Sequence, residues 1–336
     1  MKLRVGLVGI GDNWEGQYRP ALRTLQDRFE VQAVYAEVPA KASQVAEEFT
    51  AETVRGFRSL VSRSDIDAVL ILSSAWIGPL PILAACEFGK AIYCAPAFAV
   101  GHDRAEEIKA RIETAGIAFT AEFPRRHSPA TLRLKELIAT RLGQPQMLFC
   151  HERQHDNHDG NSATERKQNG DSFSTQLMEL VDWCNYVVGQ SPQSVLGMAH
   201  HSSDRSRDYQ MMSLDFPTEG ESTSATMAQI SCGTYVPQSW PEAISFRPPA
   251  QLQVCCEHGI AFVDLPTTLI WFDQAGRHLE SLDQDRPVGE QLLTQFHRSV
   301  TSLVRNSEDL NDAFRALQIV TVAEQSAKDG TRIMLS

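Results

Sequence analysis

The chain has 336 residues, of which 42% are hydrophobic and 22% are charged, as in ordinary folded proteins. At about 150 residues per domain, this length predicts roughly two domains. The 31 Lys and Arg against 42 Asp and Glu give a net charge of −11 with no basic block, which excludes nucleic acid and anionic membranes as expected partners. No apolar run reaches the about 20 residues that span a bilayer, and no signal-peptide pattern is present, so we expect a cytoplasmic protein.

Short apolar runs alternate with helical patterns through the first third of the chain. Such runs, bounded by glycines or charged turns, are typical of buried parallel strands. The alternation predicts an α/β domain over residues 1–121, built on a parallel sheet with helices on both faces. The expected strands are 3–8, 31–36, 67–72, 91–94 and 117–121, and the expected helices are 16–28, 40–49, 80–88 and 103–115.

The pattern changes after Phe123, where longer helices and short alternating segments replace the strand–helix units. Alternating segments split by Pro, Gly and Asp fill residues 193–282 and predict an antiparallel sheet. We therefore expect an α+β domain over 122–336, whose C-terminal helices can pack back on the first domain. The polar stretch 154–169 predicts a mobile loop. The expected helices are 130–142, 172–188, 289–305 and 308–328, and examples of expected strands are 209–216, 224–232 and 250–256.

Gly9-Ile-Gly11 lies between the first strand and the first helix, which is the place of a phosphate-binding loop. The first glycine permits the tight turn, and the second lets the backbone approach a pyrophosphate. We expect the pyrophosphate over Gly9, Gly11 and Asp12, and Gly11→Val to abolish cofactor binding while leaving the fold largely intact. Trp14 stands where a third glycine is usual, and Gly16 arrives two residues later. The alternative is a tight strand–helix turn without a ligand.

The end of the second strand bears on the choice of cofactor. A carboxylate there normally holds the ribose 2′-hydroxyl, and Glu37 is the candidate. It lies one residue beyond the usual position, and alternation along the strand could point it the other way. Ala36 leaves space for a 2′-phosphate, but no Arg follows and Glu37 would repel that phosphate. We therefore expect NAD, with NADP as the alternative. Trp14, which could flank the cofactor or only pack, completes the predicted cofactor set together with Ser73 and Ser74 after the third expected strand.

Taken together, the motifs resemble the glucose–fructose oxidoreductase / inositol dehydrogenase / MocA (Gfo/Idh/MocA) family over nearly the whole chain. The resemblance implies an N-terminal Rossmann domain and a C-terminal α+β domain with a large, mostly antiparallel sheet. It also implies NAD(P), redox chemistry on sugars, polyols and similar compounds, and homo-oligomers, dimers or tetramers, formed through the open face of that sheet. The matching stretches are Val8–Gly11, Ser64–Leu72, Phe88–Cys94, Phe123–Pro129, Val181–Gly189, Leu310–Leu317 and Ser326–Gly330.

The residues that the family uses for proton transfer are replaced in this chain. Pro96 stands in place of the Lys of a Glu-Lys-Pro motif, and Thr175 and Glu179 stand in place of an Asp-x-x-x-His pair on the long helix. Thr175 and Glu179 are four apart, so they share one helix face. Glu179 could act as a carboxylate base if it faces a cleft, where burial would raise its pKa. The alternative is a solvated or hydrogen-bonded helix residue.

Other polar clusters offer weaker candidates. The density of imidazoles around His151, His155 and His158 could bind Zn²⁺, but the loop-like setting favours solvated side chains, and we expect no metal. The same loop could instead touch substrate through His155 or His158. Arg125 follows the last Rossmann strand and could pair with an anionic substrate or with a carboxylate of the second domain. The seven cysteines lack a Cys-x-x-Cys pair, which favours buried thiols in a reducing compartment.

These observations leave two main hypotheses for function. The first is an NAD(P)-dependent oxidoreductase acting on a sugar-like or otherwise hydroxylated small molecule, with Glu179 as an unusual acid/base. The second is a catalytically degenerate family member that binds nucleotide or a sugar-like ligand without turnover. The family resemblance favours the first hypothesis, and Pro96, Thr175 and Glu179 favour the second. Lyase or hydrolase chemistry with a recycled cofactor is a third possibility, with no sign in its favour beyond the histidine-rich loop.

Overall fold

The structure is a computed structural model, and the chain forms two compact units. Unit 1 comprises Met1–Pro124 and Asp285–Arg315, and unit 2 comprises Arg125–Gln284 and Ala316–Ser336. The residues that the structure describes are 1–73, 77–95, 102–156, 163–201, 208–217, 225–237, 242, 250–283, 286–302 and 308–335. Side chains are not described at 102–103, 154–156, 163–173 and 201.

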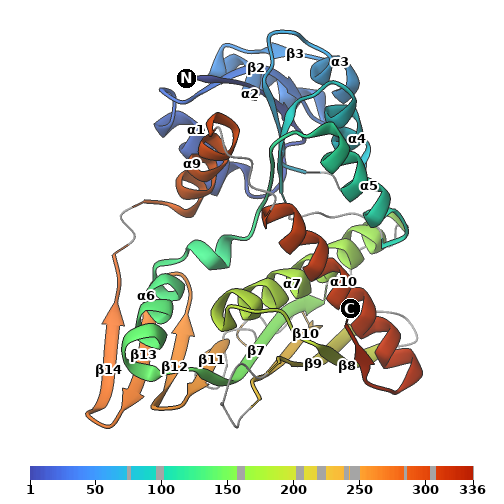
Figure 1. Ribbon diagram of the computed structural model, residues 1–336. Helices are drawn as coiled ribbons and strands as arrows, with labels where there is room; N and C mark the ends of the chain where they lie inside the picture. Colours follow the sequence, from blue (N-terminus) through green and yellow to red (C-terminus); the bar gives the residue numbers. More distant parts are fainter. Residues whose placement is uncertain are drawn as a thin grey trace. The chain divides into compact units, whose positions relative to one another are not determined.

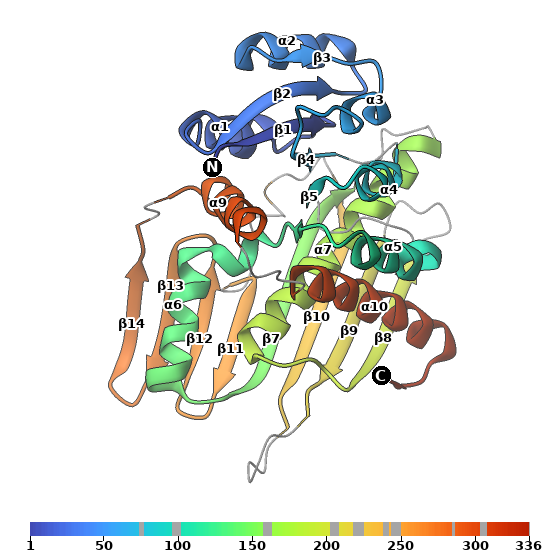
Figure 2. The same ribbon diagram turned by 45° about the horizontal axis from the view of Figure 1, so that its top comes forward.

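Unit 1 is built on a six-stranded parallel sheet with the order β3-β2-β1-β4-β5-β6 (Figure 1). This arrangement confirms the predicted α/β fold. Helices α1, α2 and α9 cover one face of the sheet, and α3, α4 and α5 cover the other (Figure 2). The strands are β1 (Leu3–Val8), β2 (Phe29–Tyr35), β3 (Glu52–Thr53), β4 (Ala68–Ile71), β5 (Ala91–Cys94) and β6 (Phe119–Ala121). The helices are α1 (Arg19–Thr24), α2 (Pro39–Phe49), α3 (Phe57–Val61), α4 (Leu80–Glu87), α5 (His102–Ala115) and α9 (Val288–Thr301).

The first connection differs from the single helix expected over 16–28. A π-helical turn, Trp14–Tyr18, comes first, and α1 follows it with Pro20 in its opening turn, where a missing N–H costs no hydrogen bond. The helix already ends at Thr24. Strand β2 then begins at Phe29, two residues before the expected start, because the Phe29 side chain is buried in the core against this sheet.

Unit 2 is built on a nine-stranded sheet with the order β14-β13-β12-β11-β7-β10-β9-β8-β15. All neighbours that pair are antiparallel except β7 and β10, which confirms the predicted α+β domain with a mostly antiparallel sheet. The strands are β7 (Pro145–Asp156), β8 (Ser194–His201), β9 (Asp208–Asp215), β10 (Met227–Pro237), β11 (Leu252–Cys256), β12 (Gly259–Asp264), β13 (Thr268–Asp273), β14 (Gly276–Ser281) and β15 (Ile333–Met334).

Helices cover one face of the unit 2 sheet (Figure 2). They are α6 (Pro129–Leu137), which continues in a π-helical turn (Ile138–Leu142), α7 (Ala163–Val188) and the C-terminal part of α10 (Glu308–Asp329). Alternation along each strand sends one set of side chains beneath these helices, as Leu148 and Cys150 show. The opposite set keeps part of its surface accessible, including Met147, Met198, Met227, Phe272 and Leu279.

The boundaries expected for a loop over 154–169 are wrong at both ends. Strand β7 runs to Asp156, and α7 already begins at Ala163 rather than at Ser172. The stretch from Thr164 to Asp171 has no large apolar residue, so hydrophobic periodicity could not reveal this helical turn. Residues 157–162 lie outside the described part of the chain.

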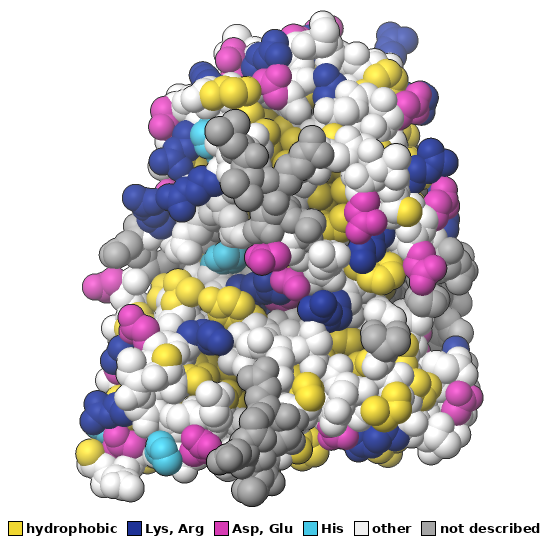
Figure 3. Space-filling view, in the orientation of Figure 1, with side chains coloured by type: hydrophobic (Ala, Val, Ile, Leu, Met, Phe, Trp, Pro, Cys, Tyr) yellow, Lys and Arg dark blue, Asp and Glu magenta, His cyan; other side chains and the backbone are white. Residues whose placement is uncertain are grey.

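Charge is mixed over the surface. Figure 3 shows basic and acidic side chains interspersed over the visible face, without a broad field of one sign. Among the described residues, no helix combines the length and the apolar character that a membrane span requires.

Candidate functional site

The glycine loop of unit 1 follows β1 and lies against the segment that follows β4. The Gly9 N–H donates to the Tyr35 carbonyl at 2.8 Å, and its φ of +77° is in the region that favours glycine. A Cβ on Gly9 would lie 2.2 Å from the Ser73 carbonyl oxygen, and one on Gly11 would lie 2.9 Å from that of Leu72. The structure therefore brings Gly9, Gly11 and Ser73 together at the carboxyl edge of the sheet, where open parallel sheets bind ligands.

The rest of the predicted cofactor set divides into exposed and buried residues. Asp12 and Glu37 are exposed, and each follows a strand that ends at this edge. Trp14 is only 4% exposed and its ring packs edge-on against Phe49, with 6.0 Å between ring centroids. The indole thus packs in the core of unit 1, and a role beside the cofactor stays a prediction. Ser74 lies outside the described residues.

The expectation for Gly11→Val also needs correction. We expected the added side chain to crowd only the cofactor and to leave the fold largely intact. The position of a Cβ on Gly11 already approaches the Leu72 carbonyl oxygen at 2.9 Å and the Ser73 Cβ at 3.3 Å. A valine would therefore push on the protein itself, so loss of binding in this variant would not separate cofactor contact from local distortion.

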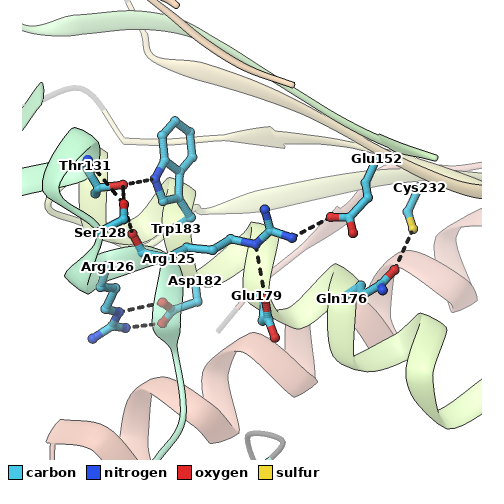
Figure 4. Close-up of polar contacts among 10 residues, drawn as sticks. All are labelled: Arg125, Arg126, Ser128, Thr131, Glu152, Gln176, Glu179, Asp182, Trp183 and Cys232. Carbon is cyan, nitrogen blue, oxygen red and sulfur yellow. Dashed lines mark hydrogen bonds and ion pairs between the residues drawn. The ribbon is translucent and has the colours of Figure 1, made fainter. Parts of the chain in front are cut away.

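Unit 2 carries a cluster of charged side chains around Arg125 (Figure 4). Arg125 belongs to the short 3₁₀ helix Pro124–His127, and its Nε donates to Glu179 Oε2 at 3.1 Å while its Nη2 donates to Glu152 Oε2 at 2.5 Å. The side chains are only 15%, 20% and 16% exposed for Arg125, Glu179 and Glu152. Burial opposes the charge on Arg125, but the two carboxylates outweigh it and hold the pKa of the guanidinium above its usual value.

The neighbouring side chains hold the Arg125 segment in place. The Ser128 hydroxyl donates to the Arg125 carbonyl at 3.0 Å and accepts from the Thr131 N–H at 3.4 Å, so Ser128 caps α6. The Trp183 indole N–H of α7 donates to the Thr131 hydroxyl at 3.0 Å. These contacts link the chain around Arg125 to both α6 and α7. They hold the backbone of Arg125 in place and so position its guanidinium.

Arg126 and His127 complete this segment. Arg126 forms a two-bond ion pair with Asp182 of α7, with Nε at 2.5 Å from Oδ2 (Figure 4). Burial, and the nearby charge of Arg126, lower the pKa of His127 to about 4. His127 is therefore uncharged at neutral pH.

The pairing of β7 with β10 places a second polar group beside Glu152. Cys232 is the register partner of Glu152, and its thiol donates to Gln176 Oε1 of α7 at 3.6 Å. Burial raises the pKa of Cys232 to about 12, so this thiol is protonated at neutral pH. Gln176 and Glu179 are three apart on α7, and the helix thus presents both toward the strand pair (Figure 4).

The outcome for the predicted residues of unit 2 is mixed. Arg125 and Glu179 lie in direct contact, and Thr175 is 7% exposed. The side chain of His155 lies outside the described residues, as do His158 and Pro96. Sequence reasoning missed Glu152, although a signal existed, because Glu152 continues the strand face that begins with the apolar Leu148 and Cys150. Within the described part of the chain, no three His, Cys, Asp or Glu side chains are grouped to hold a metal.

A glycine-bounded loop at the carboxyl edge of a parallel sheet defines the class of Rossmann-fold nucleotide-binding proteins. Residues 3–123 match the model of an oxidoreductase family with an NAD-binding Rossmann fold. This match over unit 1, together with the curated relatives, supports the resemblance to the Gfo/Idh/MocA family found in the sequence.

Individual relatives share parts of the chain. Inositol 2-dehydrogenase 3 of Saccharopolyspora erythraea is 29% identical over 152 residues, which cover 45% of each chain. The 2,7-anhydro-N-acetylneuraminate hydratase of Escherichia coli is 22% identical over 251 residues, covering 71% of this chain and 63% of that protein. The chain thus spans less than two thirds of the length of these curated relatives. An aldose–aldose oxidoreductase of Caulobacter crescentus, complexed with glycerol, shares the fold with a TM-score of 0.80 at 14% identity over 100% of both chains.

Proposed function

We propose that this protein is an NAD(P)-dependent oxidoreductase that acts on a sugar, a polyol or a related hydroxylated small molecule. Unit 1 binds the dinucleotide, and Glu179 of unit 2 accepts the proton of the substrate hydroxyl. The observation that carries the proposal is the Arg125–Glu179 ion pair at 3.1 Å, which fixes the orientation of a partly exposed carboxylate. The match of residues 3–123 to an oxidoreductase family and the names of the relatives, which include an inositol dehydrogenase, support the same reaction class.

The residues of unit 1 suit a dinucleotide. The loop from Gly9 to Gly11 offers backbone N–H groups without a Cβ at either glycine, and Ser73 adds a hydroxyl at the same edge. The exposed carboxylate of Glu37 suits the ribose hydroxyls and would repel a 2′-phosphate, so we propose NAD over NADP. A bound NAD would supply the acceptor for the hydride that leaves the substrate carbon.

Oxidation of an alcohol also releases a proton, and the chain must supply its acceptor. Glu179 is the candidate because it carries a carboxylate that Arg125 holds in a fixed orientation, whereas Thr175 offers only a weakly acidic hydroxyl.

Two further features belong to this proposal. The accessible apolar side chains on the uncovered face of the unit 2 sheet suit contact with a second copy of the chain, so we propose a homo-oligomer. We also propose that the protein acts in the cytoplasm, where the free thiols of the described cysteines would stay reduced.

The test compares Glu179→Gln with a matched control, Glu136→Gln, whose carboxylate pairs with Arg133 on the surface of α6. We expect Glu179→Gln to lower turnover by about 10²-fold or more and to leave NADH affinity unchanged, because the residue lies in unit 2. Fluorescence titration with NADH and NADPH reports binding separately from turnover.

The opposite results favour other readings. Full turnover by Glu179→Gln would reject this residue as the base and would point to His127, His155 or His158. NADH binding without turnover on any sugar, polyol or 2-hydroxy acid would support a binding protein instead of an enzyme. The replacement of the family's Lys by Pro96 and of its Asp by the buried Thr175 favours this alternative.

A further inference from the structure

We infer that Glu152 is a specificity-determining residue, which occupies the guanidinium of Arg125 in the place of a substrate carboxylate and so restricts the site to uncharged polyols and sugars. This inference rests on the proposed function, because it names the substrate class of the same site. The residue types of the site do not decide between acidic and uncharged sugars, because an arginine beside a substrate site commonly binds a carboxylate.

The first observation is that the Nε–Nη2 edge of Arg125, one of the two edges through which a guanidinium binds a carboxylate, is already filled. A guanidinium binds a carboxylate best through two parallel N–H groups, and Nε with Nη2 form one such edge. Here Nε donates to Glu179 and Nη2 donates to Glu152, at 3.1 and 2.5 Å. A substrate carboxylate would have to displace one of these protein carboxylates to reach the same edge.

The second observation is the balance of charge around this guanidinium. Two carboxylates of the protein contact a single positive side chain, so the three groups together carry an excess of negative charge. Each side chain is at most 20% exposed, and water therefore screens the repulsion of a third carboxylate only weakly. An uncharged hydroxyl meets no such repulsion, and it can donate to either glutamate.

The third observation is that Glu152 is held by a rigid element. It lies inside β7, which pairs with β10 on one side and β11 on the other, and its register partner Cys232 is tied to Gln176 of α7. The side chain is not on a surface loop that could swing aside when an acidic ligand arrives. The restriction is therefore a fixed property of the site.

The test uses D-glucose and D-glucuronate, which differ by a carboxylate at one carbon, and measures binding by calorimetry to the full-length protein saturated with NADH. We expect the wild-type protein to bind glucose at least tenfold more tightly than glucuronate. Glu152→Gln keeps an oxygen for the Arg125 N–H but removes the charge, so it should raise the ratio of glucuronate affinity to glucose affinity about tenfold. Glu136→Gln is the control and should change neither affinity.

A second variant protects the test against misfolding of the first. Glu179→Gln relieves the same guanidinium from the other side and should shift the glucuronate-to-glucose ratio in the same direction. Equal binding of both sugars by the wild type, or an unchanged ratio in both variants, would overturn the inference, and binding of neither sugar would contradict it together with the proposed function. Retained glucose selectivity without any turnover would contradict the proposed function alone, because binding does not require hydride transfer.

Discussion

The guanidinium of Arg126 closes off the carboxylate of Asp182, whose side chain is only 2% exposed. The two side chains meet through two hydrogen bonds, from the segment after β6 to the middle of α7. A carboxylate this deeply buried is costly unless its charge is balanced, so the pair fixes how the Arg125 segment docks on α7. Arg126 thus serves the candidate site by holding its neighbour, Arg125, in position.

Removing the Arg126 guanidinium should lower the stability of the folded protein. We expect Arg126→Met to lower the free energy of unfolding by about 3 kcal/mol, because the charge of Asp182 stays buried after its partner is lost. The control is Arg58→Met, which breaks a pair with Glu87 in which the side chains are 62% and 53% exposed. We expect this variant to change stability by less than about 1 kcal/mol. Urea unfolding followed by circular dichroism measures both, and equal losses would contradict the assignment.

Three glycines between β1 and α1 should respond differently to replacement by alanine. A Cβ on Gly9 would lie 2.2 Å from the Ser73 carbonyl oxygen at a positive φ, whereas a Cβ on Gly16 has no atom within 4 Å. We expect Gly9→Ala to lower both the melting temperature and NADH affinity, with Gly11→Ala intermediate. Gly16→Ala should leave the melting temperature unchanged or raise it slightly. Thermal melts with and without NADH check the order, and a stable Gly9→Ala protein would refute it.

A buried acid in unit 1 predicts a dependence of stability on pH. Glu122 is 5% exposed and accepts a hydrogen bond from Gln17, and burial raises its pKa above the ordinary 4.5. The folded state thus binds this proton more tightly than the unfolded state. Its contribution to stability is complete below pH 4.5 and is lost as the pH rises through the higher pKa of the folded state.

Glu122→Gln tests this dependence, because glutamine mimics the protonated side chain and keeps an acceptor for Gln17. We expect the difference in stability between the variant and the wild type to shift in favour of the variant as the pH rises from 4 to 8. The comparison is Glu113→Gln on α5, whose side chain is 52% exposed. A difference for Glu122→Gln that stays constant with pH would show that this carboxyl does not titrate abnormally.

The uncovered face of the unit 2 sheet predicts self-association. Met227 and Phe272 are each 37% exposed on this face, and burial of such side chains between two copies would be favourable. We expect a solution mass above the 37.4 kDa of one chain, and the double variant Met227→Glu with Phe272→Glu should reduce it to one chain. Leu132→Glu, on the exposed side of α6, is the control. Light scattering at micromolar concentration decides, and a monomeric wild type would count against the interface.

The sequence predicted the parts of the fold that local patterns determine. Buried parallel strands such as β1 and β4 appear as short apolar runs, and the glycine loop after β1 needs two residues without a Cβ. The start of α7 stayed hidden because its residues are polar, and a polar helix has no apolar period to detect. We expected that C-terminal helices can pack back on the first domain, but the individual long-range contacts were not predicted, such as Phe296 of α9 in the same core as Leu3.

The candidate site shows the same limit at the level of single residues. Glu179 and Arg125 were each predicted from their place in the chain, but their contact depends on how α7 docks against the segment after β6. Glu152 was not predicted, although its alternation with Leu148 and Cys150 indicated an inward position. The pairing of β7 with β10 beneath α7 is what places it beside Arg125 and Glu179, and that pairing is not visible in the sequence.

The close approach of Ser73 to Gly9 has a consequence for how the sequence of this loop would change during evolution. The glycine is required by the neighbouring backbone whether or not a nucleotide is ever present. A descendant that stopped using a dinucleotide would still be selected to keep Gly9, simply in order to fold. The first marks to fade would be exposed side chains that brace nothing, such as Asp12 and Glu37. In this architecture the packing of the protein itself would keep Gly9, whereas only a bound ligand would select for Asp12 and Glu37.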